Sequence, residues 1–236
     1  PGERHPSPRR RSPDLVSLAR ALVVTPRLLL LGWPCSTLDA KLRVSMREEI
    51  RRLQQQLHMT AMFVTHDQEE CFAISDRVAV MNQGKIEQFD TPQNIYRAPK
   101  TEFVARFIGY ENFLPIASTT DAGYRVGEDT FAAAKAVPAA KVLTIRPDRI
   151  VIGDGDNAVA GVVQSSTYLG NSYRYLVPTA VGTLKVDRTG FDRLADGTKL
   201  SLPLPQPSWL ALALPLIQKG ENTPPVEALH FSPCLT

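Results

Sequence analysis

The sequence predicts an α/β domain followed by an all-β domain. Apolar runs with helical and strand spacing alternate through the first 109 residues, whereas short β-rich runs separated by turns follow from Tyr110 onward. A chain of 236 residues is long enough for one sizeable domain or two small ones. We therefore divide it into a disordered Pro/Arg-rich segment (1–14), an α/β part (15–109), a β part (110–212) and an irregular tail (213–236).

Composition narrows the class of protein. With 43% hydrophobic and 22% charged residues the chain resembles an ordinary globular protein. No apolar run approaches the roughly 20 residues that a membrane helix needs, and no basic-then-apolar leader opens the sequence, so we expect a cytoplasmic location. Cys35, Cys71 and Cys234 are few and widely spaced, which predicts reduced thiols and no metal site.

Charge is distributed unevenly along the chain. Residues 1–58 hold 11 Lys and Arg against 5 Asp and Glu. Such a basic segment can indicate nucleic acid, anionic lipid or a phosphate ligand as partner. The alternative is that "PRRRSPD" is a solvated, disordered tail, and we favour that interpretation because the segment holds almost nothing apolar.

The α/β part begins with a helix and a strand. The spacing of apolar residues predicts a helix from Leu15 to about Val23, which Thr25-Pro26 ends. Four leucines, 28–31, predict a buried strand whose tip is Gly32-Trp33. The helix over 40–58 is the best-defined element, because apolar residues recur every three or four positions between Arg, Glu and Gln.

Shorter elements follow. "TAMFVT" predicts a buried strand, "QEECFAIS" a helix, and "RVAVMNQGKIEQF" a hairpin that turns at Asn82-Gln83-Gly84. "TPQNIYR" and "TEFVARFIG" predict two short helices, the first capped by Thr91 and the second closed by Gly109. Beyond them, seven β-rich runs indicate a small barrel or sandwich: "NFLPI", "GYRVG", "KVLTIRP", "AVAGVVQSSTYLG", "NSYRYLVP", "GTLKVD" and "TKLSLPLP".

Five runs, in this order, resemble the ATP-binding subunits of ABC transporters. They are "LARALVVTPRLLLL", "STLDAKLR", "FVTHDQEE", "SDRVAVMNQGKIEQFDTPQNIYRAPKTEFVARFIG" and, in the β part, "LTIRPDRI" with "TYLGNSYRYLV". The resemblance covers about Leu15 to Leu204 and is to bacterial importers of the polyamine, iron, sulfate or phosphonate type that carry a C-terminal TOBE domain. It implies a partial P-loop ABC nucleotide-binding domain followed by an all-β, OB-like TOBE barrel.

The resemblance also implies ATP hydrolysis with Mg²⁺, coupled to solute import, and this chain departs from the family's pattern. Where the family has its catalytic Asp and Glu, this chain has Gly32 and Trp33, which can neither hold Mg²⁺ nor accept a proton. The Ser-Gly-Gly-Gln signature falls on residues 8–12, "PRRRS", and no G-x-x-x-x-G-K-[ST] occurs. We therefore expect no ATP hydrolysis, and the missing residues argue against binding of ATP and Mg²⁺.

Other family positions are retained. Ser36 and Asp39 match the D-loop, which in the family contacts the partner subunit, and Asp39 is also a candidate helix N-cap. His66 matches the switch histidine that donates to the terminal phosphate, although a lone histidine at a strand end is more often structural. Asp67, Glu69 and Glu70 fit a solvated helix start better than a metal cluster.

By resemblance, the partners are transmembrane permease subunits and a second copy of the chain, at the inner face of the cell membrane. We expect an N-terminally truncated, degenerate or frameshifted product whose catalysis is lost. The alternatives are a non-catalytic regulatory or small-anion-binding TOBE module, and a non-functional gene fragment. Specific nucleic-acid binding is disfavoured because the arginines lie far from the β part in sequence and only 7% of residues are aromatic. We assign no transported solute.

Overall fold

The computed structural model describes residues 13–32, 40–133, 136–190, 192–206, 208–213 and 227–232 of the chain. It divides into two compact units. We call Pro1–Ile95 with Thr223–Thr236 the α/β unit, and Tyr96–Asn222 the β unit. In the described ranges, every helix is too short or too polar to cross a membrane.

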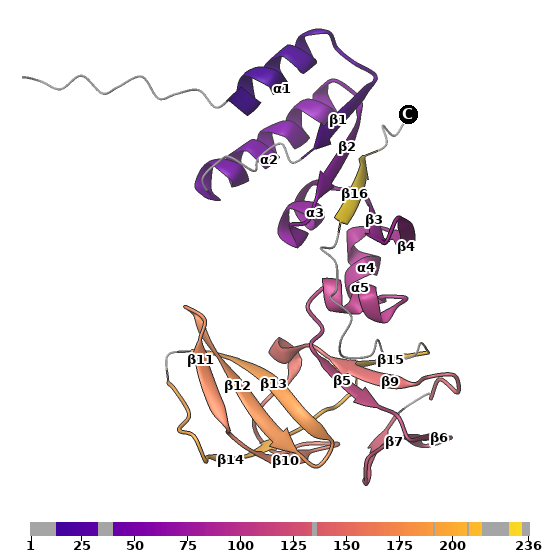
Figure 1. Ribbon diagram of the computed structural model, residues 1–236, viewed down its shortest axis with the longest axis vertical. Helices are drawn as coiled ribbons and strands as arrows, with labels where there is room; N and C mark the ends of the chain where they lie inside the picture. Colours follow the sequence, from indigo (N-terminus) through magenta and orange to yellow (C-terminus); the bar gives the residue numbers. More distant parts are fainter. Residues whose placement is uncertain are drawn as a thin grey trace, which may run out of the picture. The chain divides into compact units, whose positions relative to one another are not determined.

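The α/β unit is built on one five-stranded sheet. Its elements are α1 (Pro13–Val23), β1 (Leu28–Gly32), α2 (Ala40–Gln56), β2 (Thr60–Thr65), α3 (Gln68–Ile74), β3 (Arg77–Asn82), β4 (Lys85–Asp90) and β16 (Glu227–Ser232). The strand order is β1-β2-β16-β3-β4 (Figure 1). Strands β1 and β2 are parallel, while β16 is antiparallel to both of its neighbours and β3–β4 is a hairpin.

Three helices contribute to the core of this sheet. The buried cluster joins Leu18 of α1, Ile50 of α2 and Ile74 of α3 to the sheet residues Leu29, Ala61 and Phe63 and to Met59. Helix α1 begins at Pro13, two residues before the predicted start, because the fixed φ of proline and its missing N–H suit a first helical turn. The helix ends before Thr25, whose φ is +43°. Residues 1–12 lie outside the described ranges.

Strand β1 is less buried than its four leucines predict. Leu29 is 5% exposed, but Leu28 and Leu30 are 51% and 63% exposed. The reason is its place in the sheet: β1 is an edge strand, and alternate side chains point to the face opposite the core cluster. The prediction of a fully buried strand is therefore wrong for this face.

The short elements of this region match their predictions. The β3–β4 hairpin turns through Gln83 and Gly84, both at positive φ (48° and 75°), as a two-residue turn between twisted strands requires. The predicted short helices are α4 (Pro92–Arg97) and α5 (Glu102–Phe107). Thr91 Oγ1 accepts a hydrogen bond from the Asn94 N–H at the start of α4, and Gly109, at φ 88°, follows α5.

The β unit contains three sheets. Its strands are β5 (Asn112–Pro115), β6 (Ser118–Thr120), β7 (Gly123–Val126), β8 (Asp129–Ala132), β9 (Val142–Ile145), β10 (Val159–Val162), β11 (Ser165–Tyr168), β12 (Ser172–Thr179), β13 (Gly182–Thr189), β14 (Lys199–Leu202) and β15 (Trp209–Leu212), with a 3₁₀ turn, η1 (Pro147–Arg149). The sheets are β11-β12-β10-β14 with β13 on β12, β15-β9-β5, and β6-β7-β8.

These pairings correct the expectation of an OB-like barrel. Among the described residues the strands form three open sheets, and no strand pairing closes a sheet into a barrel. Strand β9 pairs with β15 on one side and with β5 on the other, and these three strands form a sheet apart from the larger one. What holds the sheets together is one shared core that includes Tyr124 of β7, Tyr175 of β12 and Trp209 of β15. The Tyr124 and Trp209 rings pack edge to face with centroids 5.7 Å apart.

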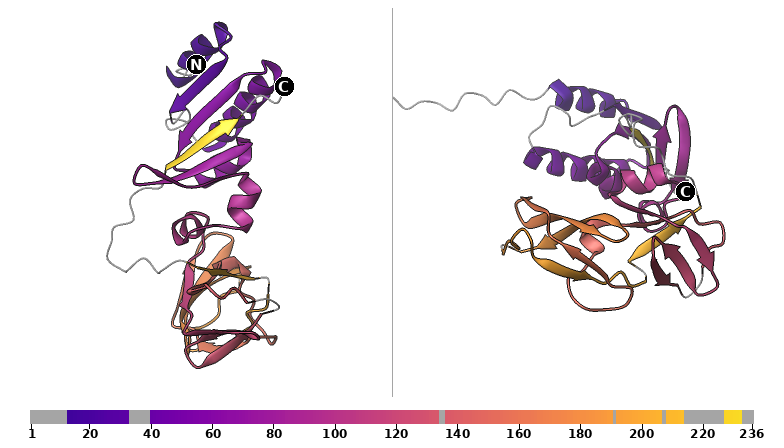
Figure 2. Two further views of the ribbon diagram at one scale, coloured as in Figure 1. Left: turned by 90° about the vertical axis from the view of Figure 1, so that its right-hand side faces the viewer. Right: turned by 60° about the horizontal axis from the view of Figure 1, so that its bottom comes forward.

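The C-terminal segment departs most from prediction. The sequence analysis expects an irregular tail over 213–236, yet residues 227–232 form β16 inside the sheet of the α/β unit (Figure 2, yellow strand). The segment has no clear apolar period, so its sequence carries little strand signal. Backbone pairing to strands on both sides defines this element, and such pairing depends on residues far away in the sequence.

Candidate functional site

The carboxyl ends of β1 and β2 form the candidate nucleotide site. The parallel register pairs Gly32 with Val64, so the residues that follow both strands emerge at the same edge of the sheet. A Cβ added to Gly32 would meet no atom of the described residues within 4 Å. His66 follows β2 directly and its side chain is exposed. The structure thus places Gly32 and His66 at one edge.

The remaining predicted site residues cannot be placed. Trp33, Ser36 and Asp39 lie outside the described ranges, as do residues 8–12, which match the signature. Their family roles therefore stay predictions. Helix α2 begins at Ala40, directly after Asp39, in agreement with the predicted helix over 40–58.

The carboxylates after β2 are engaged in holding the local fold. Asp67 is the N-cap of α3, and its Oδ1 accepts the N–H groups of Glu69 at 2.8 Å and Glu70 at 3.1 Å. Glu70 Oε2 in turn accepts the Thr65 hydroxyl at 2.8 Å. The predicted helix start is confirmed, and two of these three side chains serve the turn between β2 and α3.

The described residues of this edge offer no set of side-chain ligands for Mg²⁺. Gly32 offers no oxygen, Asp67 and Glu70 are engaged as described, and no three His, Cys, Asp or Glu side chains in the described part of the chain gather as metal ligands. A hard cation such as Mg²⁺ needs oxygen ligands in near-octahedral array. By resemblance, His66 is the phosphate donor of this edge.

Helix α3 is anchored on its other side by a buried thiol. Cys71 is fully buried, and burial raises the pKa of its thiol, with the charge of Asp67 adding to the effect. A thiol held in its neutral form is a poor nucleophile. Cys71 therefore serves packing, which agrees with the predicted reduced state of the cysteines.

A shallow groove lies between α2 and α3. It has a volume of ≈ 370 Å³ and is lined by Val44, Arg47, Glu48, Arg51, Arg52, Gln55, Ala73 and Ile74. Two of its arginines are paired. Arg51 makes a bidentate contact with Asp76 at 2.5 and 2.9 Å, and Arg52 donates hydrogen bonds to Glu49 and Gln56. The positive charge of Arg51 and Arg52 in this groove is therefore offset by Asp76 and Glu49.

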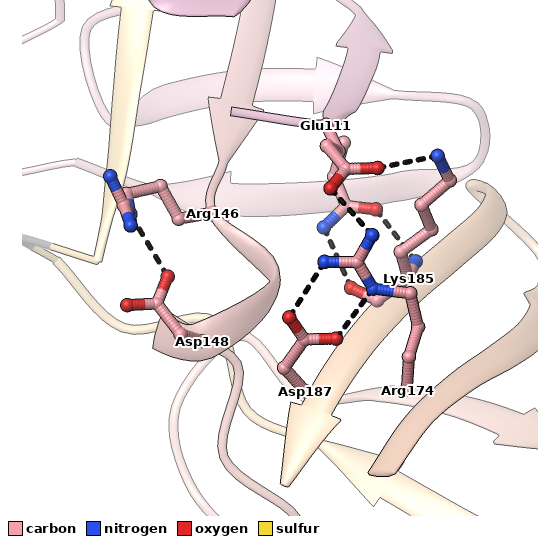
Figure 3. Close-up of polar contacts among 7 residues, drawn as sticks. Glu111, Arg146, Asp148, Arg174, Lys185 and Asp187 are labelled. Carbon is pink, nitrogen blue, oxygen red and sulfur yellow. Dashed lines mark hydrogen bonds and ion pairs between the residues drawn. The ribbon is translucent and has the colours of Figure 1, made fainter. Parts of the chain in front are cut away.

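The β unit contains a second polar centre, a cluster of four charged residues (Figure 3). Arg174 of β12 donates from Nε and Nη2 to both carboxylate oxygens of Asp187, each at 2.7 Å. Its Nη1 reaches Glu111 Oε1 at 2.7 Å, and Lys185 Nζ reaches Glu111 Oε2 at 2.5 Å. Two cations face two anions, so the cluster is balanced in charge.

The same cluster attaches the chain before β5 to the β12–β13 ribbon. Asn112, 2% exposed, donates to the Lys185 carbonyl at 2.9 Å and accepts the Lys185 N–H at 2.7 Å. For Glu111, burial favours the neutral carboxyl, but the bonds and charges of Lys185 and Arg174 outweigh it and lower the pKa. The hydrogen bond to Asp187 is the main reason why the pKa of Arg174 is raised.

Arg146, which follows β9, is a third organising side chain. It donates to Asp148 at 2.9 Å and to the Ile108 carbonyl at 2.5 Å, and it lies over the Tyr96 ring, 4.6 Å from its centroid. The sequence analysis quotes the runs that contain Arg146 and Arg174 but assigns neither residue a role. Only the alternation of Arg174 with Tyr173 and Tyr175 signals that its side chain faces away from the core.

Comparisons with known proteins agree with the resemblance. A TOBE domain model matches residues 143–212. The chain is 44% identical over 176 residues to the Fe(3+) ions import ATP-binding protein of Rhizobium etli, which covers 72% of this chain and 50% of that protein. It is 48% identical over 139 residues to a sulfate/thiosulfate import ATP-binding protein of Chromobacterium violaceum (58% of this chain, 38% of that protein).

A third relative is the spermidine/putrescine import ATP-binding protein of Pseudomonas fluorescens, 41% identical over 187 residues, with 74% of this chain and 50% of that protein covered. The chain thus spans half or less of the length of these relatives. The TOBE match lies within the β-rich C-terminal region. The chain belongs to the family of ATP-binding subunits of ABC importers that carry a TOBE domain.

Proposed function

We propose that this chain descends from the energy-coupling subunit of an ABC importer and has lost ATP hydrolysis. The observation that carries the proposal is the end of β1. The described part of β1 ends at Gly32, next to the end of β2 and His66, where the family resemblance calls for a carboxylate that holds Mg²⁺. An enzyme of this class works almost entirely by positioning phosphates, metal and water, so removal of these groups removes the catalysis.

The neighbouring carboxylates do not substitute for the missing acids. A general base must be within reach of the attacking water and free to accept its proton. Asp67 and Glu70 are bound to the backbone of α3 and to Thr65, and rotating either away would leave those donors unsatisfied. His66 is a donor to phosphate in the family, and the acids near it, Asp67 and Glu70, are already engaged in the turn that leads into α3.

Nucleotide binding tests this proposal. We expect equilibrium dialysis with labelled ATP to show no saturable, Mg²⁺-dependent binding to the full chain. The double variant Gly32→Asp/Trp33→Glu restores the two acids of the family. We expect it to bind no ATP either, because the given sequence contains no G-x-x-x-x-G-K-[ST] loop to hold the phosphates. Saturable binding by the unaltered chain that disappears with EDTA would contradict the expected loss of the Mg²⁺-ATP site, and phosphate release that depends on Mg²⁺ would refute the proposed loss of hydrolysis.

By descent, the partners are a permease at the inner face of the cell membrane and a second copy of the chain. These assignments rest on the family, since the relatives' names describe import of iron, sulfate and spermidine by those proteins. A pull-down with the permease subunits of an ABC importer, using the unaltered chain and His66→Ala, would test docking. We expect docking, if it occurs, to be independent of His66, because the histidine faces the nucleotide edge.

A non-catalytic role of the β unit is the second candidate, and one observation favours it. Its core holds nineteen buried residues, from Leu114 to Trp209, which all lie inside the unit. Such a core supports folding without the α/β unit. We expect fragment 96–222 to resist protease and to unfold cooperatively. If it binds a small anion such as inorganic sulfate, the charged cluster is not the site, because its cations are already neutralised by Glu111 and Asp187.

A further inference from the structure

The outer end of the β11–β12–β13 ribbon carries a row of two tyrosines and one arginine. The antiparallel registers pair Tyr168 of β11 with Tyr173 of β12, and Tyr173 with Arg188 of β13 (strands labelled in Figure 1). Residues that lie directly opposite each other on antiparallel strands share one face of the sheet. The row therefore presents two phenol rings and one guanidinium on a single face of the ribbon.

The inner ring of this row is anchored in the core of the β unit. Two residues further along β12 and β13, the same face carries Tyr175 and Val186, both 0% exposed. Tyr173 packs against this core, and the Tyr168 ring lies over it with centroids 5.1 Å apart and planes tilted by 47°. Tyr168 is 54% exposed. A fixed inner ring thus supports an outer ring that is open to solvent, which limits the ordering cost for a ligand that covers it.

Arg188 carries a charge that the described residues leave unused. Its side chain is exposed, and no described residue engages its guanidinium in an ion pair or a hydrogen bond. Two nearby arginines differ: Arg174 lies on the opposite face, in the cluster of Figure 3, and Arg193 pairs with Asp196 at 3.1 Å. The Arg188 guanidinium can therefore offer parallel N–H donors to a carboxylate.

The size and charge of this face select one class of ligand. The quadrupoles of two phenol rings favour another aromatic ring in offset or edge-to-face contact. Single-stranded nucleic acid needs a basic groove that follows several phosphates, which one unpaired arginine does not supply. A stable protein interface buries about 800 Å² on each partner. At this end of the ribbon the exposed large apolar side chains among the described residues are Tyr168 and Leu169, which favours a small ligand.

We propose that Tyr168, Tyr173 and Arg188 bind a small planar aromatic carboxylate, with its ring against the two tyrosines and its carboxylate on the arginine. This ligand class deepens the non-catalytic role proposed above for the β unit, and it rests on that role. The site shares no residue with the edge formed by Gly32 and His66, so binding requires neither Mg²⁺ nor a phosphate cradle.

Titration of the full chain with naphthoate tests the site. The readout is NMR of isotope-labelled tyrosine rings, in which Tyr168→Phe and Tyr173→Phe identify the two signals. We expect both signals to shift with one Kd of about 0.1–1 mM, the affinity of a ligand of this size. Naphthalenemethanol, which lacks the charge, and cyclohexanecarboxylate, which lacks the aromatic ring, should each bind at least about tenfold more weakly.

Four variants separate the ring from the charge. Tyr168→Ala and Arg188→Gln should each weaken naphthoate binding by about 5- to 20-fold, and both side chains are exposed, so the core stays intact. Tyr168→Phe keeps the ring and should bind within about twofold of the unaltered chain. Arg149→Gln removes another exposed arginine of the β unit and is the matched control, with the same expected result as Tyr168→Phe.

Three results would overturn the proposal. The first is naphthoate binding that Tyr168→Ala or Arg188→Gln leaves unchanged, or no shift of the Tyr168 signal up to the solubility limit of the ligand. The second is binding of oligothymidylate without binding of naphthoate, which would exclude a small ligand. The third is binding of inorganic sulfate without binding of naphthoate, which would preserve an anion-binding role of the β unit but exclude this site.

Discussion

The charged cluster of the β unit makes a quantitative prediction for Arg174→Gln. Arg174 makes three charge-assisted contacts, all at 2.7 Å, and its side chain is 30% exposed, against 17% for Asp187 and 29% for Glu111. Glutamine replaces at most one contact and leaves Asp187 half-buried without its cation. Hydrogen bonds to charged groups contribute about 1.5–3 kcal/mol each, and partial exposure to solvent weakens the contacts of Arg174. We therefore expect Arg174→Gln to lower the free energy of unfolding by about 2–4 kcal/mol.

Arg193→Gln is the matched control. Arg193 pairs with Asp196 at 3.1 Å, but the two side chains are 55% and 54% exposed, so we expect a loss of at most about 0.5–1 kcal/mol. Pulse proteolysis across a urea gradient, with peptides of the β unit quantified, measures both variants. The reasoning is refuted if Arg174→Gln is no more destabilising than Arg193→Gln, since the half-buried geometry would then contribute nothing.

Three further predictions concern single side chains. Gly123 and Gly153 share positive φ (149° and 147°), but only at Gly123 would a Cβ meet a backbone oxygen, Phe131 O at 2.0 Å, so in urea melts Gly123→Ala should cost at least about 2 kcal/mol more than Gly153→Ala. The pKa of Glu111 is lowered in the folded chain, so as pH falls the unfolded chain takes up this proton first. The stabilisation by the Glu111 carboxylate is therefore present above about pH 4.3 and is lost as pH falls through the folded pKa. Glu111→Gln should make the free energy of unfolding, measured by urea melts, less dependent on pH in this acid range. The raised pKa of the buried Cys71 thiol predicts that iodoacetamide leaves it unlabelled in the native protein at pH 8, by peptide mass spectrometry, and labels it in urea.

Local sequence patterns predicted much of the secondary structure of the α/β unit. The α2 periodicity, the Asn82-Gln83-Gly84 turn and the Thr91-Pro92 helix start are all signals within a few residues, and each element forms where expected. In the β unit, the seven quoted runs contain β5, β7 and β9 to β14. The strands β6, β8 and β15 lie outside the quoted runs, and their length does not explain this, since β5 and β7 also have only four residues.

The remaining features depend on pairs of residues that are distant in the sequence. Strand β16 is defined by its pairing with β2 and β3, and Leu28 and Leu30 are exposed because β1 is at an edge of the sheet. A short window of sequence reveals neither feature. The contact of Lys185 with Glu111 joins residues 74 apart. Of the candidate site, the sequence located the Gly32 and His66 edge through family resemblance, whereas the commitment of Glu70 to Thr65 needed coordinates.

Single-turnover phosphate release is the measurement that tests the central claim most directly. The full chain, in excess over labelled ATP with Mg²⁺, should release phosphate no faster than buffer alone, and His66→Ala should be indistinguishable from it, because β1 ends at Gly32 without an acid. Phosphate release above the buffer rate that requires Mg²⁺ and falls in His66→Ala would contradict the account, since the chain would then retain a working hydrolytic site.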